Sequence, residues 1–316
     1  MIMSGSLSLP AFRYGGKNEG PRLLITAGVH GDEYLPMLAV HHLVQHFAGN
    51  PDEADSIRGS LTLIPVVNES AFIEGNRCGS DGKDLARTCP GNPDGTTTER
   101  AAAALSAEIE KADYYVDLHT GGTELSVLPM SGYVLHSDEA ILEKQRNLAR
   151  AFQLPFCWGT SGELEGRSLS VARDAGVPAI YVEYLGSHRE VAEATAGIDG
   201  GHPLVHGCLN VMRHLGLLSE KECTSVAPES VEDSRPDSGH MQVCHPAPAT
   251  GFFNSCVALG QQVEEGDLIA QITPPGSANP LEVRANRSGK VLVLRDYPRI
   301  NQNDATAVIA EPYPNT

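Results

Sequence analysis

Apolar and polar positions follow two alternating periods along the first two thirds of the chain. Short apolar runs, typical of buried strands, alternate with stretches in which apolar residues recur every three or four positions, as on one face of a helix. Expected strands cover residues 22–27, 60–67, 114–118 and 179–183, and expected helices cover residues 35–47, 98–111, 140–152 and 168–175. This alternation predicts an α/β domain with a largely parallel sheet.

The pattern changes near residue 218. Residues 220–239 are polar and acidic, and from residue 241 onward the helical period disappears. Short strand-like runs follow, separated by Gly, Pro and Asn, at residues 251–257, 268–273, 289–295 and 306–310. We therefore predict an α/β domain over residues 1–218, an acidic linker or arm over 219–240 and an all-β domain over 241–316.

Composition narrows the classes of partner and the compartment. The 316 residues include 23 Lys and Arg against 40 Asp and Glu, a net charge of -17, which argues against binding nucleic acid or an anionic membrane surface. No apolar run approaches the length of a membrane-spanning helix, and the N-terminus lacks the pattern of a secretory signal. The seven cysteines include no C-x-x-C pair, so we expect reduced thiols in a cytoplasmic protein.

Candidate catalytic residues stand where the predicted strands end. Ligands of open parallel sheets bind beyond the carboxyl ends of the strands. The first strand leads to His30 and Glu33, the second to Asn68, the third to His119, and a later strand to Glu183. Chance alone would rarely place two histidines and two glutamates at such strand ends.

These residue types favour a zinc site. Catalytic zinc typically takes three His, Glu or Asp ligands and keeps a fourth position for water, whose pKa it lowers to about 7. His30 and Glu33 can face one point from a single turn, and His119 completes the set from a distant strand. Gly28 and Gly31 allow that turn to be sharp.

Two further carboxylates have roles in this hypothesis. Glu183 suits proton transfer from the attacking water to a leaving amine. Asp117, two residues before His119, faces the same side of its strand and is expected to orient that histidine. An isolated H-x-x-E pair is common by chance, and a lone glutamate is often an ion-pair partner, so the hypothesis depends on the whole combination.

Five segments also match the motifs of a known family in order. They are residues 28–33 (GVHGDE), Asn68 with 75–77 (GNR), 81–87 (DGKDLAR), 117–120 (DLHT) and 177–183 (VPAIYVE). The chain thereby resembles the succinylglutamate desuccinylase/aspartoacylase family of the zinc carboxypeptidase superfamily. The resemblance implies a zinc-carboxypeptidase-like α/β fold with a mixed, largely parallel sheet flanked by helices.

The resemblance also assigns roles to individual residues. It implies that His30, Glu33 and His119 bind one Zn²⁺ per subunit, and that Glu183 acts as general base and then as acid. Arg77 would polarise the scissile carbonyl and stabilise the oxyanion.

Substrate binding is implied for two more positions, Arg87 and Asn68. Arg87 would grip a substrate carboxylate, for which a guanidinium is well shaped. The family usually has Asn directly before this arginine, whereas this chain has Ala86. Either the carboxylate is held differently or the substrate has none there. Lys83 and Arg173 are open as alternative contacts.

The C-terminal stretch resembles the barrel-sandwich fold of biotinyl and lipoyl domains over residues 251–273 and 283–291. A carrier domain needs a modifiable lysine at a hairpin tip, but residues 285–287 (Ala-Asn-Arg) occupy that turn and Lys290 belongs to the following strand. We therefore expect a non-carrier module. In the family such a module covers the active site or builds a homo-oligomer.

Together these features predict a zinc-dependent amidohydrolase that removes an acyl group from a small N-acylated amino acid or related amine. Two alternatives are open. The same zinc chemistry serves a metallocarboxypeptidase acting on peptides, and a non-catalytic metal-binding protein would keep the ligands without turnover. We expect no nucleic-acid or membrane partner.

Overall fold

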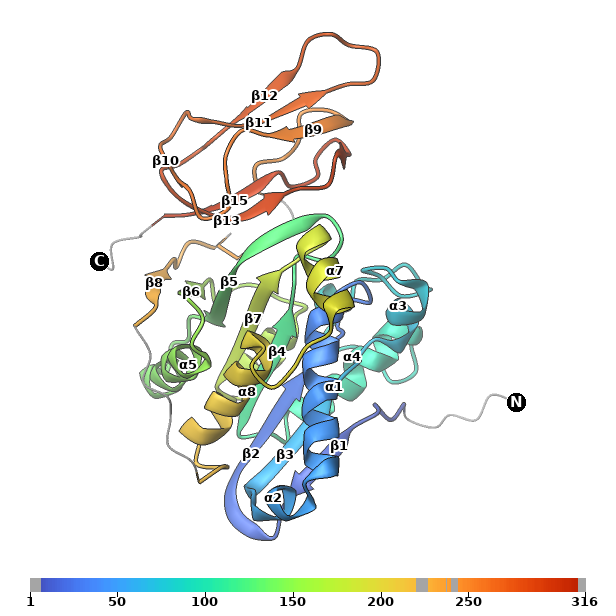
Figure 1. The fold of residues 1–316 in the computed structure, drawn as a ribbon, viewed down its shortest axis with the longest axis vertical. Coiled ribbons are helices and arrows are strands. Elements are labelled where there is room, and N and C mark those ends of the chain that lie inside the picture. The colour runs from blue at the N-terminus through green and yellow to red at the C-terminus, as the bar shows by residue number, and fades with distance from the viewer. Residues whose placement is uncertain (1–6, 220–226, 237, 240–243, 312–316) are drawn as a thin grey trace.

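A computed structural model describes residues 7–219, 227–236, 238–239 and 244–311, and Figure 1 shows its arrangement. Most of the chain forms a mixed α/β layer structure, and a smaller β sheet lies at one end of it, at the top of Figure 1. The mixed α/β fold predicted from the sequence is thus confirmed. No helix among the described residues has both the length and the apolar character needed to cross a membrane.

An eleven-stranded sheet forms the main layer, with the path β1-β3-β2-β4-β7-β5-β13-β10. Its strands are β1 (Phe12–Gly15), β2 (Asn18–Thr26), β3 (Arg58–Ile64), β4 (Tyr114–His119), β5 (Leu125–Val134), β6 (Phe156–Thr160), β7 (Ala179–Leu185), β8 (Glu229–Glu232), β10 (Gln262–Val263), β13 (Gly289–Arg295) and β15 (Ala307–Ala310). β3, β2, β4 and β7 are parallel neighbours, as the alternating pattern predicted. β5 runs antiparallel to β7 and makes the sheet mixed.

Helices pack on both faces of this sheet. They are α1 (Tyr34–Gly49), α2 (Pro51–Ser56), α3 (Glu69–Glu74), α4 (Thr97–Ile109), α5 (Glu139–Phe152), α6 (Ser168–Asp174), α7 (Ser187–Ala196) and α8 (Pro203–His214), with a short 3₁₀ turn, η1, at Leu85–Arg87. α1, α5 and α8 bury their apolar sides on one face, and α4 and α6 cover the other.

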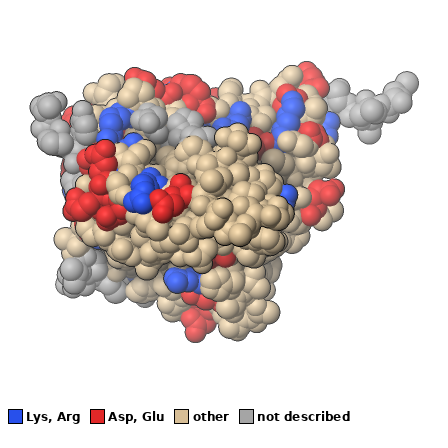
Figure 2. Space-filling view, turned by 90° about the horizontal axis from the view of Figure 1, so that it is seen from above, with Lys and Arg blue, Asp and Glu red and all other residues tan. Residues whose placement is uncertain are grey.

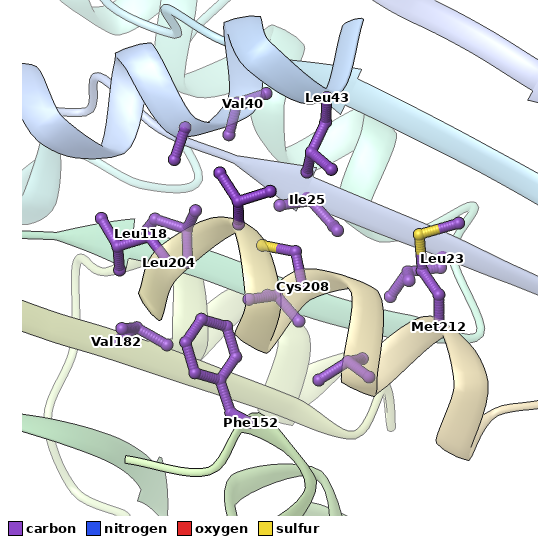
Figure 3. Close-up of a cluster of buried hydrophobic side chains, with 14 of the residues drawn as sticks. Leu23, Ile25, Val40, Leu43, Leu118, Phe152, Val182, Leu204, Cys208 and Met212 are labelled. Carbon is purple, nitrogen blue, oxygen red and sulfur yellow. The ribbon is translucent and has the colours of Figure 1, made fainter. Parts of the chain in front are cut away.

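Alternation along the parallel strands explains the two apolar layers. Leu118 of β4 and Val182 of β7 point toward α1, α5 and α8, where they meet Phe152, Leu204 and Cys208 (Figure 3). Successive strand residues face opposite sides of a sheet, so the neighbours of Leu118 and Val182 point the other way. Those neighbours include His119 and Glu183, which lie side by side in the strand register.

The predicted acidic arm is connected to the main sheet. Within residues 219–240, Glu229–Glu232 forms β8, which pairs in parallel with β6. Farther along, the Ser238 hydroxyl accepts the Ser161 N–H at 2.7 Å, and Asp233 is buried. Hydrogen bonds thus tie the described part of this segment to the α/β layer.

A separate C-terminal sheet has the strand order β12-β11-β9-β14. Its strands are β9 (Gly251–Ser255), β11 (Leu268–Thr273), β12 (Leu281–Arg284) and β14 (Arg299–Ile300). It shares an apolar core with β13 and β15, and β13 pairs antiparallel with β5 of the main sheet. Seen from above in Figure 2, this end has a broad surface without charged side chains, with Lys, Arg, Asp and Glu gathered toward its margins.

The cysteines agree with the expectation of free thiols. Cys78, Cys89, Cys157, Cys208 and Cys256 are free in the structure, and three of these, Cys89, Cys157 and Cys208, are buried. Cys223 lies outside the described residues.

Candidate active site

Two histidines and a glutamate meet at the carboxyl end of the parallel strands. One potential ligand atom from each of His30, Glu33 and His119 lies within 4.8 Å of the other two. The Nδ1 atoms of His30 and His119 lie 2.6 Å and 3.0 Å from the two carboxylate oxygens of Glu33. All three residues are buried, with exposed fractions of 4%, 1% and 8%.

The loop that carries His30 and Glu33 depends on close backbone packing. Gly28 has a positive φ of 68°, and a Cβ on Gly31 would stand 1.9 Å from the backbone carbon of Ala71. Only glycine fits that approach. The sharp turn expected from these two glycines is therefore present.

The outer nitrogens of both histidines face carboxylates. His30 Nε2 lies 3.1 Å from Asp84, and His119 Nε2 lies 3.1 Å from Asp117. Metal-binding histidines usually have such a partner on the nitrogen that does not face the metal, because it fixes the tautomer and the ring orientation. In both histidines Nδ1 faces Glu33 and Nε2 faces a second carboxylate. This arrangement fits a zinc site of the predicted composition.

Charge around the cluster also suits a cation. Although burial pushes the pKa of Glu33 upward, the two facing histidines hold it below its ordinary value. Burial pushes the pKa of His119 downward, but Asp117 and Glu33 hold it well above its ordinary value. The cluster thus stabilises positive charge between its members, which a divalent ion would supply.

Glu183 stands beside this cluster. Glu183 of β7 is the register partner of His119 on the adjacent strand β4. It lines the same cavity and is only 5% exposed. Its Oε2 is buried without a hydrogen-bond partner. Burial raises the pKa of the Glu183 carboxyl to about 8, and the Glu33 charge adds to this effect while His119 opposes it. A buried carboxyl with a free oxygen and a pKa near neutrality is well placed to accept and return a proton.

Arg77 reaches the cavity through Asp84. Its Nε donates to Asp84 Oδ2 at 3.0 Å, and its Nη1 lies 3.5 Å from His30 Nδ1. Asp84 therefore orients both the candidate ligand His30 and the Arg77 guanidinium. No such role was predicted for Asp84 from the sequence, although it lies within the DGKDLAR segment.

A third arginine of the cavity, beside Arg77 and Arg87, was not predicted from the sequence. Arg167 lines it together with Arg87 and Ala86 and donates from both terminal nitrogens to the Gly239 carbonyl, each at 3.3 Å. A Cβ on Gly166 would stand 2.8 Å from the Arg87 carbonyl oxygen, so the two arginine-bearing segments pack closely. Burial, followed by the charge of Arg87, lowers the pKa of Arg167 to about 10.

Three residues considered for substrate contact do not line this cavity. Asn68 caps α3, with its Oδ1 accepting from the Ala71 N–H at 3.2 Å, and this use of its side chain gives no support to the predicted substrate-binding role. Lys83 pairs with Glu99 at 2.5 Å. Arg173 donates to backbone carbonyls and pairs with Glu165 and Asp174.

Part of the cavity lining is apolar. This part consists of Leu125 and Val127 of β5, Leu169 of α6 and Val293 of β13. Val127 and Val293 are register partners across the junction between β5 and β13. The C-terminal part of the chain therefore contributes directly to the wall of the candidate active site.

Residues 19–200 match the family model described as the succinylglutamate desuccinylase/aspartoacylase catalytic domain. This span covers more than half of the chain and includes every candidate residue above. The chain belongs to this family. The match confirms the resemblance found in the sequence motifs.

Characterised and solved members of the family extend the similarity to nearly the whole chain. The N-alpha-acetyl-L-2,4-diaminobutyric acid deacetylase of Halomonas elongata is 31% identical over 303 residues, which cover 93% of this chain and 83% of that protein. A succinylglutamate desuccinylase/aspartoacylase structure from Rhodobacter sphaeroides is 26% identical, with a TM-score of 0.81 over 98% of this chain and 91% of that one. The product-bound ectoine utilization protein EutE (DoeB) of Ruegeria pomeroyi is 27% identical, with a TM-score of 0.80 over 96% of this chain and 89% of that one.

Proposed function

We propose that this chain is a zinc-dependent amidohydrolase that removes an acyl group from a small N-acylated amino acid. The observation that carries the proposal is the buried Glu183 carboxyl, with a free oxygen, in the same cavity as the His30–Glu33–His119 cluster. A deacetylase among the relatives supports the same class of reaction.

The roles of the residues follow from their positions. Zinc held by His30, Glu33 and His119 would polarise the acyl carbonyl and lower the pKa of attacking water. Glu183 accepts a proton from that water and delivers it to the leaving amine, which needs a carboxylate that changes protonation near neutral pH. Arg77, oriented by Asp84, places positive charge beside the carbonyl oxygen as negative charge develops there.

Arg87 and Arg167 form the proposed carboxylate-binding end of the cavity. Ala86 has no polar side chain, so it cannot donate where the family usually has Asn. Arg167 brings a second guanidinium to the same segment, and its partner Gly239 is a neutral carbonyl rather than a carboxylate. A substrate carboxylate between the two guanidinium groups would therefore gain charge-assisted hydrogen bonds.

Peptide hydrolysis is the second candidate, because the metal chemistry alone does not distinguish it. Apolar side chains of β5 and β13 line the same cavity as the candidate metal cluster, and this added lining favours the smaller substrate. We further propose that the C-terminal strands form a barrel-sandwich module of the biotinyl and lipoyl type, used here to build that lining rather than to carry a prosthetic group.

The test compares two enzyme forms on a substrate panel. Purified zinc-loaded protein is assayed on N-acetyl and N-succinyl amino acids, N-acetyl-diaminobutyrate among them, and on dipeptides. We expect release of free amine from the N-acyl substrates. We also expect Glu183→Gln to lower kcat by about 10²- to 10⁴-fold while zinc content stays at that of the parent protein. Cleavage of dipeptides alone would establish the peptidase alternative, and no turnover by a fully zinc-loaded protein would favour the non-catalytic one.

A further inference from the structure

Helix α1 begins at Tyr34, directly after the candidate ligand Glu33. The first N–H groups of a helix lack partners within the helix, and a side chain at the capping position usually supplies one. Glu33 occupies that position but makes no capping hydrogen bond. Both of its carboxylate oxygens face histidines instead, so its use in the cluster leaves the start of α1 without its own cap.

A distant carboxylate supplies the missing partner. Glu190 lies in the first turns of α7, 155 positions beyond Leu35, and its Oε1 accepts the Leu35 N–H at 2.9 Å. Its side chain is 1% exposed. Burying a carboxyl group so completely is costly unless its oxygens are hydrogen-bonded, so this contact is a defined part of the fold.

The other oxygen of Glu190 binds the second ligand segment. Thr120, which directly follows His119, donates its hydroxyl to Glu190 Oε2 at 2.7 Å. The same hydroxyl accepts the Gly122 N–H at 3.2 Å. One buried side chain therefore joins the segment that carries Glu33 to the segment that carries His119.

A parallel contact joins the same two segments nearby. Asp32 Oδ2 accepts from the backbone N–H of Thr123 at 3.2 Å and from its hydroxyl at 3.3 Å. Asp32 belongs to the loop that also carries His30 and Glu33, whereas Glu190 belongs to helix α7, which begins shortly after Glu183.

We propose that Glu190 is a positioning residue of the metal site, which caps α1 in place of Glu33 and holds the Glu33 and His119 segments at the separation that the metal requires. The inference rests on the proposed function insofar as it takes these residues as zinc ligands. Side chains that orient metal ligands through hydrogen bonds commonly change metal affinity by 10- to 100-fold when they are removed.

The test measures zinc affinity by competition with a chromophoric chelator, and the melting temperature of the metal-free protein. Glu190→Ala should weaken zinc binding by roughly 10- to 100-fold. Glu190→Gln should restore most of that affinity, because its carbonyl oxygen can accept the Leu35 N–H and its amide can donate to Thr120. Thr120→Val should weaken binding less than Glu190→Ala, and the double variant Glu190→Ala/Thr120→Val should be no worse than Glu190→Ala alone.

A matched control separates positioning from general stability. Met212→Ala opens the core on α8, where Met212 is fully buried, and should lower the melting temperature at least as much as Glu190→Ala while leaving zinc affinity within twofold of the parent. Unchanged zinc affinity in Glu190→Ala, or equal weakening in Met212→Ala, would overturn the inference. If Glu190→Ala does not fold, full zinc affinity in Thr120→Val overturns it, and weakened affinity with Glu190→Gln near the parent supports it. A parent protein that binds no zinc would instead refute the proposed function.

Discussion

The two sides of the candidate cavity are built by different kinds of strand. One side carries the metal cluster and Glu183, supplied by β4, β7 and the loop after β2, where parallel strands end together. The other side carries Leu125, Val127 and Val293, supplied by the antiparallel pair β5 and β13. Chemical groups are thus positioned where parallel strands end, whereas these apolar side chains are positioned where two antiparallel strands pair directly.

Substitutions in these two sets of residues should therefore have separate effects. Changes to the His30–Glu33–His119 cluster should lower metal content, and changes to the cluster or to Glu183 should lower turnover on every substrate. Changes on the apolar side should affect the choice among substrates and leave the metal in place.

The largest effect is expected when a ligand is removed. His119→Ala should abolish stoichiometric zinc binding and lower kcat/KM by at least ~10³-fold, because water then loses its activating cation. Metal analysis and amide hydrolysis are measured together. Parent protein treated with a chelator should lose activity and regain it on addition of zinc, whereas zinc should not restore His119→Ala. Near-parent turnover in that variant would show that the cluster is not the catalytic site.

Removal of Arg167 should have the next largest effect. Arg167→Met removes a charge-assisted contact worth about 1.5–3 kcal/mol, so KM for an N-acyl amino acid should rise by roughly 10- to 150-fold. Zinc content should not change. Arg173→Met provides the matched control, since Arg173 lies outside the cavity and should leave KM unaltered. Equal effects of the two substitutions would mean that Arg167 acts through the fold rather than on the substrate.

A change in the apolar wall should be smaller and selective. Val293→Ala deletes two methyl groups, each worth about 0.8 kcal/mol when buried against substrate, so kcat/KM should fall by up to ~15-fold for the preferred substrate. Larger acyl groups should lose less or gain. Val211→Ala in the separate apolar cluster under α8, outside the cavity lining, serves as control. A uniform decrease for all substrates would contradict the proposed division of the two sides.

The smallest effect concerns pH and stability. Burial raises the pKa of the Glu190 carboxyl to about 8 in the folded chain, above its ordinary value of 4.5. Between those two values the folded state holds a proton that the unfolded state has released, so this group lowers stability as pH rises. The unfolding free energy of the metal-free parent, relative to Glu190→Gln, should therefore fall by roughly 1–3 kcal/mol from pH 5 to pH 8.5 in urea titrations. A relative stability that rises with pH would show the opposite sign of shift.

Sequence patterns anticipated the parallel part of the molecule well. The strands predicted at residues 22–27, 60–67, 114–118 and 179–183 correspond to the parallel strands β2, β3, β4 and β7, and the four predicted helices correspond to α1, α4, α5 and α6. These elements have a single clear period, and the candidate ligands and Glu183 lie at or just beyond the carboxyl ends of strands that must converge. Local pattern was therefore enough to place His30, Glu33, His119 and Glu183 together.

Elements whose role depends on distant partners were missed. β5 contains Ser126, Pro129 and Gly132, which interrupt an apolar run, and it is stabilised by strands on both sides. Arg167 follows a loop glycine rather than a strand end, so no spacing marked it. Glu190 resembles any acidic residue of a helix, and only its contact with Leu35 reveals its use.

The pairing of β13 with β5 has a consequence for synthesis of the protein. The candidate metal ligands and Glu183 leave the ribosome long before Val293, which lines the same cavity. Until Val293 is available, β5 lacks this antiparallel partner and the cavity lacks part of its apolar lining. Translation order therefore delays formation of the enclosed site until nearly the last strand has emerged.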